Sequence, residues 1–309
     1  MKLELSRSRI CSTIPSCLIL LVLACDDGEH SAPGTQEVTE PAGPERSTTL
    51  HGHDIHYESY GEAQRGQPTL VLVHGWASST WTWHRQLPGL LELGRVLVVD
   101  LPGHGKSAEI DADEEYTLDL FADAVAAVLD DAGVERAVIV GHSNGTPVAV
   151  RFYRSYPERT VALVAVDGAL QHMFSVERVE GMVAPFRADD YLDIVKQMIS
   201  GMAGDGLSDE DLRGIILMAI NTPQRVMVDS VLATADPAMW SAEPIRVPLL
   251  ALLVEQPTWN DDYRAAIEEL APQLDWVTWQ DVSHFLMLER PTEFQAELSR
   301  FLAGIGQAS

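Results

Sequence analysis

From about residue 48 onward, short apolar runs rich in β-branched residues alternate with segments of helical periodicity. Two runs, at residues 48–50 and 54–60, are separated by His51-Gly52-His53 and predict an antiparallel hairpin. Later runs are nearly all apolar, as strands buried on both faces of a parallel sheet must be. These runs lie at residues 69–73, 95–99, 137–140, 161–166, 248–254 and 275–279. The alternation therefore restricts this part of the chain to an α/β fold, a mostly parallel sheet covered by helices on both faces.

One interval interrupts the alternation. Residues 171–243 hold helical stretches rich in Met and Leu without a strand signal, which predicts a helical cap inserted between core segments 48–170 and 244–305. The clearest core helix is expected to start at Thr117, whose hydroxyl precedes an apolar stripe. A length of 309 residues suits one large α/β domain with additional segments.

The N-terminal segment has the layout of a secretory signal peptide. Basic residues within the first nine positions precede a short apolar run at 14–24, which is too short to span a bilayer. Residues 21–25, LVLAC, resemble the bacterial lipoprotein signal, which implies cleavage after residue 24 and lipidation of Cys25. An ordinary signal peptide with an uninvolved cysteine is the alternative. We expect an exported lipoprotein, held on a membrane through Cys25 and facing the periplasm or the cell exterior.

Residues 25–47 form the segment after that cysteine. They are rich in Pro, Gly, Ser, Thr and acidic residues and have no apolar periodicity, so we expect a flexible linker. Asp26 resembles the signal that retains enteric lipoproteins on the inner membrane.

Composition excludes several classes of partner. Lys and Arg total 21 against 46 Asp and Glu, a net charge of −25, so we expect no nucleic-acid partner. All three cysteines lie within the first 25 residues, which excludes disulfides and thiolate metal sites from the later segments. No phosphate-binding glycine pattern is present, so no cofactor and no metal is expected. His51, His53 and His56 could indicate a metal site, but alternating histidines on an exposed hairpin are more often solvated.

The pentapeptide GHSNG at residues 141–145 lies between an apolar strand and a helical stretch. Strand, turn and helix together are the context of a nucleophile elbow, in which a strained turn presents a serine above the sheet. The carboxyl edge of a parallel sheet is also where ligands bind in open α/β folds. Ser143 is therefore the candidate nucleophile.

Around this motif the chain resembles the α/β-hydrolase fold proteins over residues 48–302. VHGW at 73–76, DLPGHGKS at 100–107 and SHFLMLERP at 283–291 are similar to other segments of that superfamily. The resemblance implies a serine hydrolase. A serine hydroxyl needs a base, and His284 follows the last strand, which completes the expected order of serine, acid and histidine. His142 and His74 are expected to orient loops.

The triad acid departs from the pattern of the resemblance. Most members place an aspartate about four residues after the strand at 248–254, but this chain has Pro257 near that position. Other members place the acid after the preceding strand, where this chain has Asp167. Asp167 is therefore the first candidate and Glu255 the second.

The resemblance also implies an oxyanion hole made by the main-chain N–H groups of Trp76 and Asn144. Together these residues predict cleavage of a small-molecule carboxylic ester through an acyl-enzyme. Amide, lactone, thioester and carbon–carbon hydrolysis use the same groups and stay open. Serine at the elbow argues against epoxide and haloalkane chemistry, since those relatives have aspartate there. A non-catalytic binding lipoprotein is a further alternative, and the oligomeric state cannot be derived from the sequence.

Overall fold

The computed structural model describes residues 45–64 and 66–307. The predicted signal peptide at 1–24, the lipidation of Cys25 and most of the predicted linker lie outside the described residues and stay predictions. The described part differs from the expectation at its first residues, because a strand begins at Glu45 rather than at residue 48. Glu45 is paired with Glu58 across the hairpin and forms an ion pair with Lys106, so the last three residues of the predicted 25–47 linker belong to the sheet.

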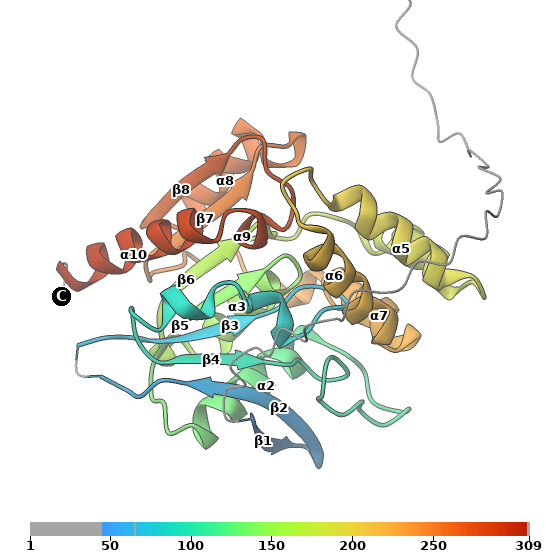
Figure 1. Ribbon diagram of the computed structural model, residues 1–309, viewed down its shortest axis with the longest axis horizontal. Coiled ribbons are helices and arrows are strands. Elements are labelled where there is room, and N and C mark those ends of the chain that lie inside the picture. Colours follow the sequence, from blue (N-terminus) through green and yellow to red (C-terminus); the bar gives the residue numbers. More distant parts are fainter. Residues whose placement is uncertain (1–44, 65, 308–309) are drawn as a thin grey trace, which may run out of the picture. The chain divides into compact units, whose positions relative to one another are not determined.

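Strands form within every run that the sequence predicts. Those of the described residues are β1 Glu45–Leu50, β2 His53–Tyr60, β3 Thr69–Val73, β4 Val96–Val99, β5 Ala137–His142, β6 Thr160–Val166, β7 Leu249–Val254 and β8 Leu274–Trp279. They form one sheet in the order β1-β2-β4-β3-β5-β6-β7-β8 (Figure 1). Strands β3 to β8 are parallel to one another, whereas β2 is antiparallel to both β1 and β4. The predicted α/β fold with a mostly parallel sheet is confirmed.

The helices of the described residues are α1 Leu87–Leu90, α2 Leu118–Asp131, α3 Gly145–Ser155, α4 Val176–Val183, α5 Tyr191–Met202, α6 Asp209–Asn221, α7 Gln224–Leu232, α8 Asp261–Leu270, α9 Leu286–Glu289 and α10 Pro291–Gln307. Helix α2 begins as predicted, since the Thr117 hydroxyl accepts a hydrogen bond from Leu120 N at 3.1 Å. None of these helices combines the length and hydropathy that a membrane crossing requires.

Alternating side chains of each central strand enter two different cores, as the two-residue period of a strand dictates. In β3, Val71 and Val73 pack with α2 and α3, whereas Leu70 and Leu72 pack with α1 and α10 on the other face. Because both faces are covered, the strands are apolar throughout. The carboxyl ends of the parallel strands remain available for a site.

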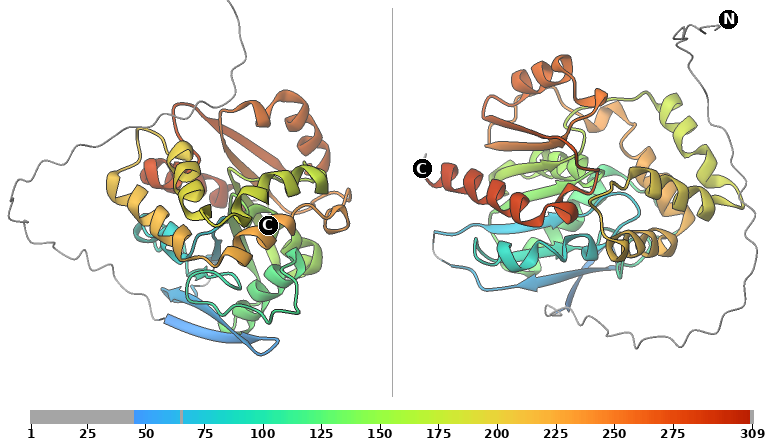
Figure 2. Two further views of the ribbon diagram at one scale, coloured as in Figure 1. Left: turned by 90° about the vertical axis from the view of Figure 1, so that its right-hand side faces the viewer. Right: turned by 45° about the horizontal axis from the view of Figure 1, so that its top comes forward.

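Between β6 and β7 the described chain is helical, as expected for residues 171–243. Helices α4 to α7 share a third apolar core that includes Val183, Phe186, Val195 and Met227. Figure 2 shows this group, coloured from yellow-green to orange, gathered beside the sheet rather than on either of its faces. We refer to α4–α7 as the cap helices.

Candidate active site

Ser143 lies on a sharp turn between β5 and α3. Its φ of 51° is in the left-handed region, which a non-glycine residue occupies only under strain. The turn is held from both sides: Ser143 N donates to Val166 O at 2.8 Å, and Thr146 N donates to Ser143 O at 3.0 Å. This is the geometry of the nucleophile elbow that the sequence predicts.

Two glycines allow the strand, the turn and the helix to approach closely. A Cβ atom at Gly141 would lie 2.2 Å from the carbonyl oxygen of Gly145, and one at Gly145 would lie 2.5 Å from the carbonyl oxygen of Val73. Both distances are far below contact with backbone atoms that cannot move aside. The GxSxG spacing is therefore a steric requirement of this turn.

Asp167 stands beside Ser143 because of strand register. His142 at the end of β5 is paired with Val166 at the end of β6, so the next residues of two adjacent strands are Ser143 and Asp167. Asp167 also has a positive φ, 45°, a conformation that aspartate tolerates better than most residues. The site is thus built from neighbouring strands at the sheet's carboxyl edge.

The Asp167 carboxylate is buried and surrounded by donors. His284 Nδ1 donates to Oδ2 at 2.6 Å, and Oδ1 accepts from Trp259 Nε1 at 2.8 Å, from Val254 N at 3.2 Å and from Gln256 Nε2 at 3.3 Å. Burial alone would raise the pKa of this carboxyl, but the hydrogen bond and charge of His284 and the donors of Trp259 and Val254 hold its pKa below the ordinary value. Asp167 is therefore held as the anion.

Most members of the superfamily place the triad acid in the loop after β7. In this protein that loop provides hydrogen-bond donors to Asp167 instead. Pro257 opens a 3-10 turn, Pro257–Trp259, that brings the Trp259 indole to Asp167. Glu255 is exposed, and its carboxylate accepts from Gln280 Nε2 at 3.3 Å. Of the two predicted acids, only Asp167 has a hydrogen bond to His284. Trp259 and Gln256 were not predicted as site residues, although a tryptophan two residues after the proline was the available signal.

His142 contacts His284 from the other side. His142 Nε2 donates to the main-chain oxygen of His284 at 3.0 Å, and the two ring centroids are 4.8 Å apart. Burial, followed by the positive charge that His284 can take, lowers the pKa of His142 to about 3. His142 is therefore neutral and orients the His284 loop, which is the loop-orienting role that the sequence predicts.

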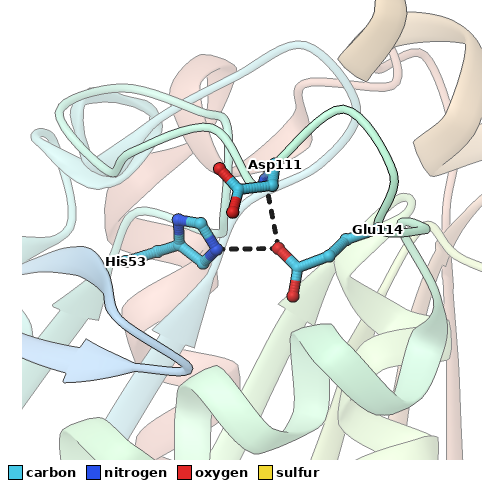
Figure 3. Close-up of side chains that lie close together, drawn as sticks. All are labelled: His53, Asp111 and Glu114. Carbon is cyan, nitrogen blue, oxygen red and sulfur yellow. Dashed lines mark hydrogen bonds and ion pairs between the residues drawn. The ribbon is translucent and has the colours of Figure 1, made fainter.

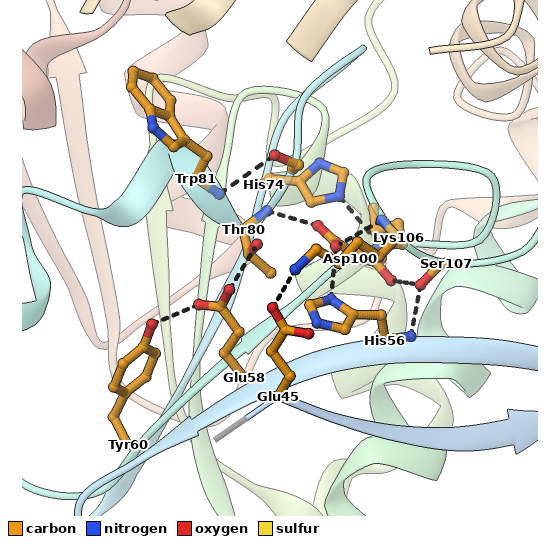
Figure 4. Close-up of polar contacts among 12 residues, drawn as sticks. Glu45, His56, Glu58, Tyr60, His74, Thr80, Trp81, Asp100, Lys106 and Ser107 are labelled. Carbon is orange, nitrogen blue, oxygen red and sulfur yellow. Dashed lines mark hydrogen bonds and ion pairs between the residues drawn. The ribbon is translucent and has the colours of Figure 1, made fainter. Parts of the chain in front are cut away.

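A second polar network holds the loop after β3 against the loop after β4 (Figure 4). The buried Asp100 carboxylate accepts from His56 Nδ1 at 2.8 Å, from Thr80 N at 2.7 Å and from Lys106 N at 2.9 Å. His74 donates from Nδ1 to Gly75 O at 2.8 Å and accepts at Nε2 from Leu101 N at 3.0 Å.

The His74 and Asp100 contacts fix the HGW segment next to the elbow. The network also explains the DLPGHGKS motif, because a Cβ at Gly105 would lie 2.3 Å from atoms of the Asp100 carboxylate.

Trp76 and Asn144, the predicted oxyanion-hole residues, are both tied to cap helix α7 through their side chains. Trp76 Nε1 donates to Met227 O at 2.7 Å, and Asn144 Nδ2 donates to Ser230 O at 3.1 Å. The sequence predicts a role only for the main-chain N–H groups of these two residues, so their side-chain contacts were not expected. They connect the turn that carries Ser143 to the cap helices.

A cavity of about 600 Å³ opens on these residues. Its lining includes Ser143, Asp167, His284, Trp76 and Asn144, so the structure brings the predicted nucleophile, base, first-choice acid and oxyanion residues to one space. Cap helices α4, α5 and α7 contribute to the wall. The volume is that of a small-molecule site.

One group of side chains away from this cavity has donors that a cation could use. His53, Asp111 and Glu114 place one ligand atom each within 4.8 Å of the others (Figure 3). His53 Nε2 already donates to Glu114 Oε2 at 2.7 Å, and Arg225 donates to the main-chain oxygens of Asp111 and Glu114. These contacts account for the cluster as a loop anchor for the β1–β2 hairpin.

Comparison with known proteins supports the fold. Residues 68–197, which include Trp76, Ser143 and Asp167, match the family model described as alpha/beta hydrolase fold. An esterase from Exiguobacterium antarcticum superposes with a TM-score of 0.73 over 84% of this chain and 99% of its own, at 17% identity. The chain has the α/β-hydrolase fold.

Curated hydrolases match part of this chain. Epoxide hydrolase B from Mycobacterium tuberculosis is 33% identical over 123 residues, which are 40% of this chain and 35% of that protein. A bifunctional esterase/perhydrolase from Acinetobacter calcoaceticus is 36% identical over 124 residues, which are 40% of this chain and 44% of that protein. The chain thus matches less than half the length of these hydrolases.

Proposed function

We propose that the protein is a serine hydrolase that cleaves small carboxylic esters through an acyl-enzyme. The observation that carries the proposal is the 2.6 Å hydrogen bond from His284 Nδ1 to Asp167 in a cavity that Ser143 also lines. A carboxylate on Nδ1 leaves Nε2 without its proton, and that nitrogen can act as a base toward a serine hydroxyl. Hydrolases and an esterase among the similar proteins support the same reaction class.

In the acylation step, Ser143 Oγ attacks the ester carbonyl carbon while His284 Nε2 takes the hydroxyl proton. The tetrahedral oxyanion accepts hydrogen bonds from the main-chain N–H groups of Trp76 and Asn144, each worth roughly 3–4 kcal/mol in such sites. His284 then gives its proton to the leaving alkoxide as the carbon–oxygen bond breaks. The buried Asp167 carboxylate stabilises the imidazolium that forms between these two events.

In the deacylation step, a water molecule loses a proton to His284 Nε2 and attacks the acyl carbon. The bond to Ser143 Oγ breaks, Oγ recovers the proton from His284, and the carboxylic acid leaves. Amide, lactone, thioester and carbon–carbon substrates would use the same groups. Ser143 argues against the alkyl-enzyme mechanism of epoxide hydrolases, because the related epoxide hydrolases use an aspartate as nucleophile at this position.

The test is hydrolysis of nitrophenyl esters of graded acyl length by the full-length chain, by Ser143→Ala and by Ser200→Ala. We expect turnover to vanish in Ser143→Ala, because the acyl-enzyme cannot form. Ser200 is exposed on α5 and donates to Lys196 O, so its variant controls for the loss of a serine. Turnover that persists in Ser143→Ala would contradict the proposed nucleophile. Absence of turnover on every ester would favour the amide or carbon–carbon alternatives or a binding protein.

A further inference from the structure

The wall of the active-site cavity is largely apolar and adaptable. Three methionines line it, Met173, Met182 and Met202, together with the indole rings of Trp240 and Trp259. Unbranched thioether side chains change rotamer at low cost and pack around ligands of different shape. An apolar ligand that displaces water from such a wall gains the most binding free energy.

The polar side chains of the same wall are mostly neutral. Gln171, Thr234 and Thr258 offer amide and hydroxyl groups, and Gln256 already donates to Asp167. Of the described residues that line the cavity, none is an arginine or a lysine. The charged groups there are the Asp167 carboxylate and, when protonated, His284. A second anion in the cavity would be buried without a cationic partner, which is strongly unfavourable.

One arginine next to this wall, Arg178, has its guanidinium against an aromatic ring. Arg178 on α4 is exposed, and its guanidinium lies 4.7 Å from the ring centroid of Phe174, a residue that lines the cavity. Arg178 itself does not line the cavity. The net charge of −25 adds a long-range field that lowers the local concentration of anionic substrates.

Resting on the proposed function, we propose that this cavity selects esters whose body is uncharged and mainly apolar, and that it rejects esters carrying a carboxylate at the far end of the acyl chain. The selection acts through desolvation, so it concerns binding in the cavity and not the chemistry at the carbonyl. Substrates of equal length therefore separate by charge alone.

The experiment compares three substrates on the full-length chain: 4-nitrophenyl octanoate, the mono-4-nitrophenyl ester of suberic acid, and that half-ester with its free carboxyl methylated. We expect kcat/KM for the anionic half-ester to be at least about 100-fold below that of the methylated form, the order expected for an unpaired buried charge. The methylated form is the matched control, since it has the same chain without the charge.

A charge placed in the wall should reverse the selection. Met182 lines the cavity and is 48% exposed, so Met182→Lys can be accommodated, and it should raise the ratio of kcat/KM for the half-ester to kcat/KM for the methylated form about tenfold. Leu217→Lys makes the same charge change on α6, at a residue that is 55% exposed and does not line this cavity. It should leave the ratio of the two substrates unchanged, as should Arg178→Gln.

Equal kcat/KM for the half-ester and the methylated form would overturn the inference, as would a selective loss of half-ester hydrolysis in Arg178→Gln. Binding to Ser143→Ala, followed by tryptophan fluorescence from the cavity wall, separates this outcome from failure of the proposed function. Weaker binding of the half-ester than of the methylated form supports the inference even without turnover. Absence of turnover on all three substrates contradicts the esterase reaction alone, and equal binding contradicts the inference alone.

Discussion

At the scale of single residues, the donors around Asp167 divide into two groups with different origins. His284 comes from the loop after β8, whereas Val254, Gln256 and Trp259 come from β7 and the loop after it. That loop is where the resembling hydrolases most often place the acid. Here it supplies donors that keep the carboxylate of Asp167, at the end of the neighbouring strand, ionised.

Asp167→Asn should lower kcat for nitrophenyl esters by ~10⁴-fold, because a neutral amide neither fixes the Nδ1–H tautomer of His284 nor stabilises its imidazolium. Glu255→Gln should leave kcat nearly unchanged, since Glu255 is exposed and contacts Gln280. Steady-state kinetics measure both, and thermal melts identify a folding defect. If Glu255→Gln proves the crippling change, the acid has been assigned to the wrong residue.

The sequence predicted Ser143 and His284 from motif and chain order, because both follow strands whose ends are marked by composition. It ranked Asp167 above Glu255 but could not decide between them, since the choice depends on which loop folds toward His284. The roles of Trp259 and Gln256 depend on a three-dimensional contact between two loops, which neither apolar periodicity nor a short motif encodes.

At the scale of secondary-structure elements, helix α7 connects the cap helices to the elbow. The carbonyl oxygens near a helix C-terminus have no intrahelical donor, and at Ser230 O the hydrogen bond is donated by Asn144 Nδ2. Trp76 reaches one turn further back, to Met227 O, and its ring lies 5.0 Å from that of Phe186. The cap helices are thus docked through the same two residues whose main-chain N–H groups face the substrate carbonyl in the proposed mechanism.

Trp76→Phe should lower kcat about tenfold and unfolding free energy by about 1 kcal/mol, the usual worth of one hydrogen bond. Phenylalanine keeps a ring against Phe186 but loses the N–H that holds α7. Trp81→Phe is the matched control, because Trp81 also packs on a cap helix, beside Gly214, and does not line the cavity. Steady-state kinetics and denaturant melts of both variants measure these effects. Equal effects of the two variants on kcat would mean that the hydrogen bond from Trp76 to α7 has no part in catalysis.

The strands were predicted to within two residues except β1, which begins three residues before its predicted start. The strand β1 extends to Glu45, and its exposed residues, Glu45, Arg46 and Ser47, carry no apolar signal. Their pairing is decided by the hairpin register with β2, which composition does not reveal. The helical interval at 171–243 was visible, but the packing of its helices around the cavity was not.

At the scale of the whole described fold, buried neutral histidines make stability depend on pH. Burial lowers the pKa of His74 below its ordinary value, and burial, followed by the charge of His74, lowers the pKa of His104 to about 3. Burial also lowers the pKa of His142 to about 3. The unfolded chain binds protons at these residues near their ordinary pKa of 6.5, whereas the folded chain does not, so stability falls as pH drops from about 6.5 toward 3.

His104→Asn should therefore flatten the decrease in Tm between pH 7.5 and pH 5. The asparagine amide can still donate to Pro102 O, as His104 Nδ1 does at 3.0 Å, but it binds no proton in the unfolded chain. His51→Asn changes an exposed histidine of the hairpin turn and serves as the control. Calorimetry across this pH range gives the slopes; a wild-type slope in His104→Asn would show that His104 does not titrate on unfolding.

The two outer strands of the sheet, β1 and β8, leave main-chain groups that another molecule's strand could bind. Both of these edge strands carry charged side chains. Exposed Glu45 and Arg46 begin β1, and on β8 Asp275 forms an ion pair with Arg300 at 2.7 Å. A strand from a second copy would have to remove water from these charges before it could pair, so the charged residues on β1 and β8 disfavour pairing of this sheet with the sheet of another molecule.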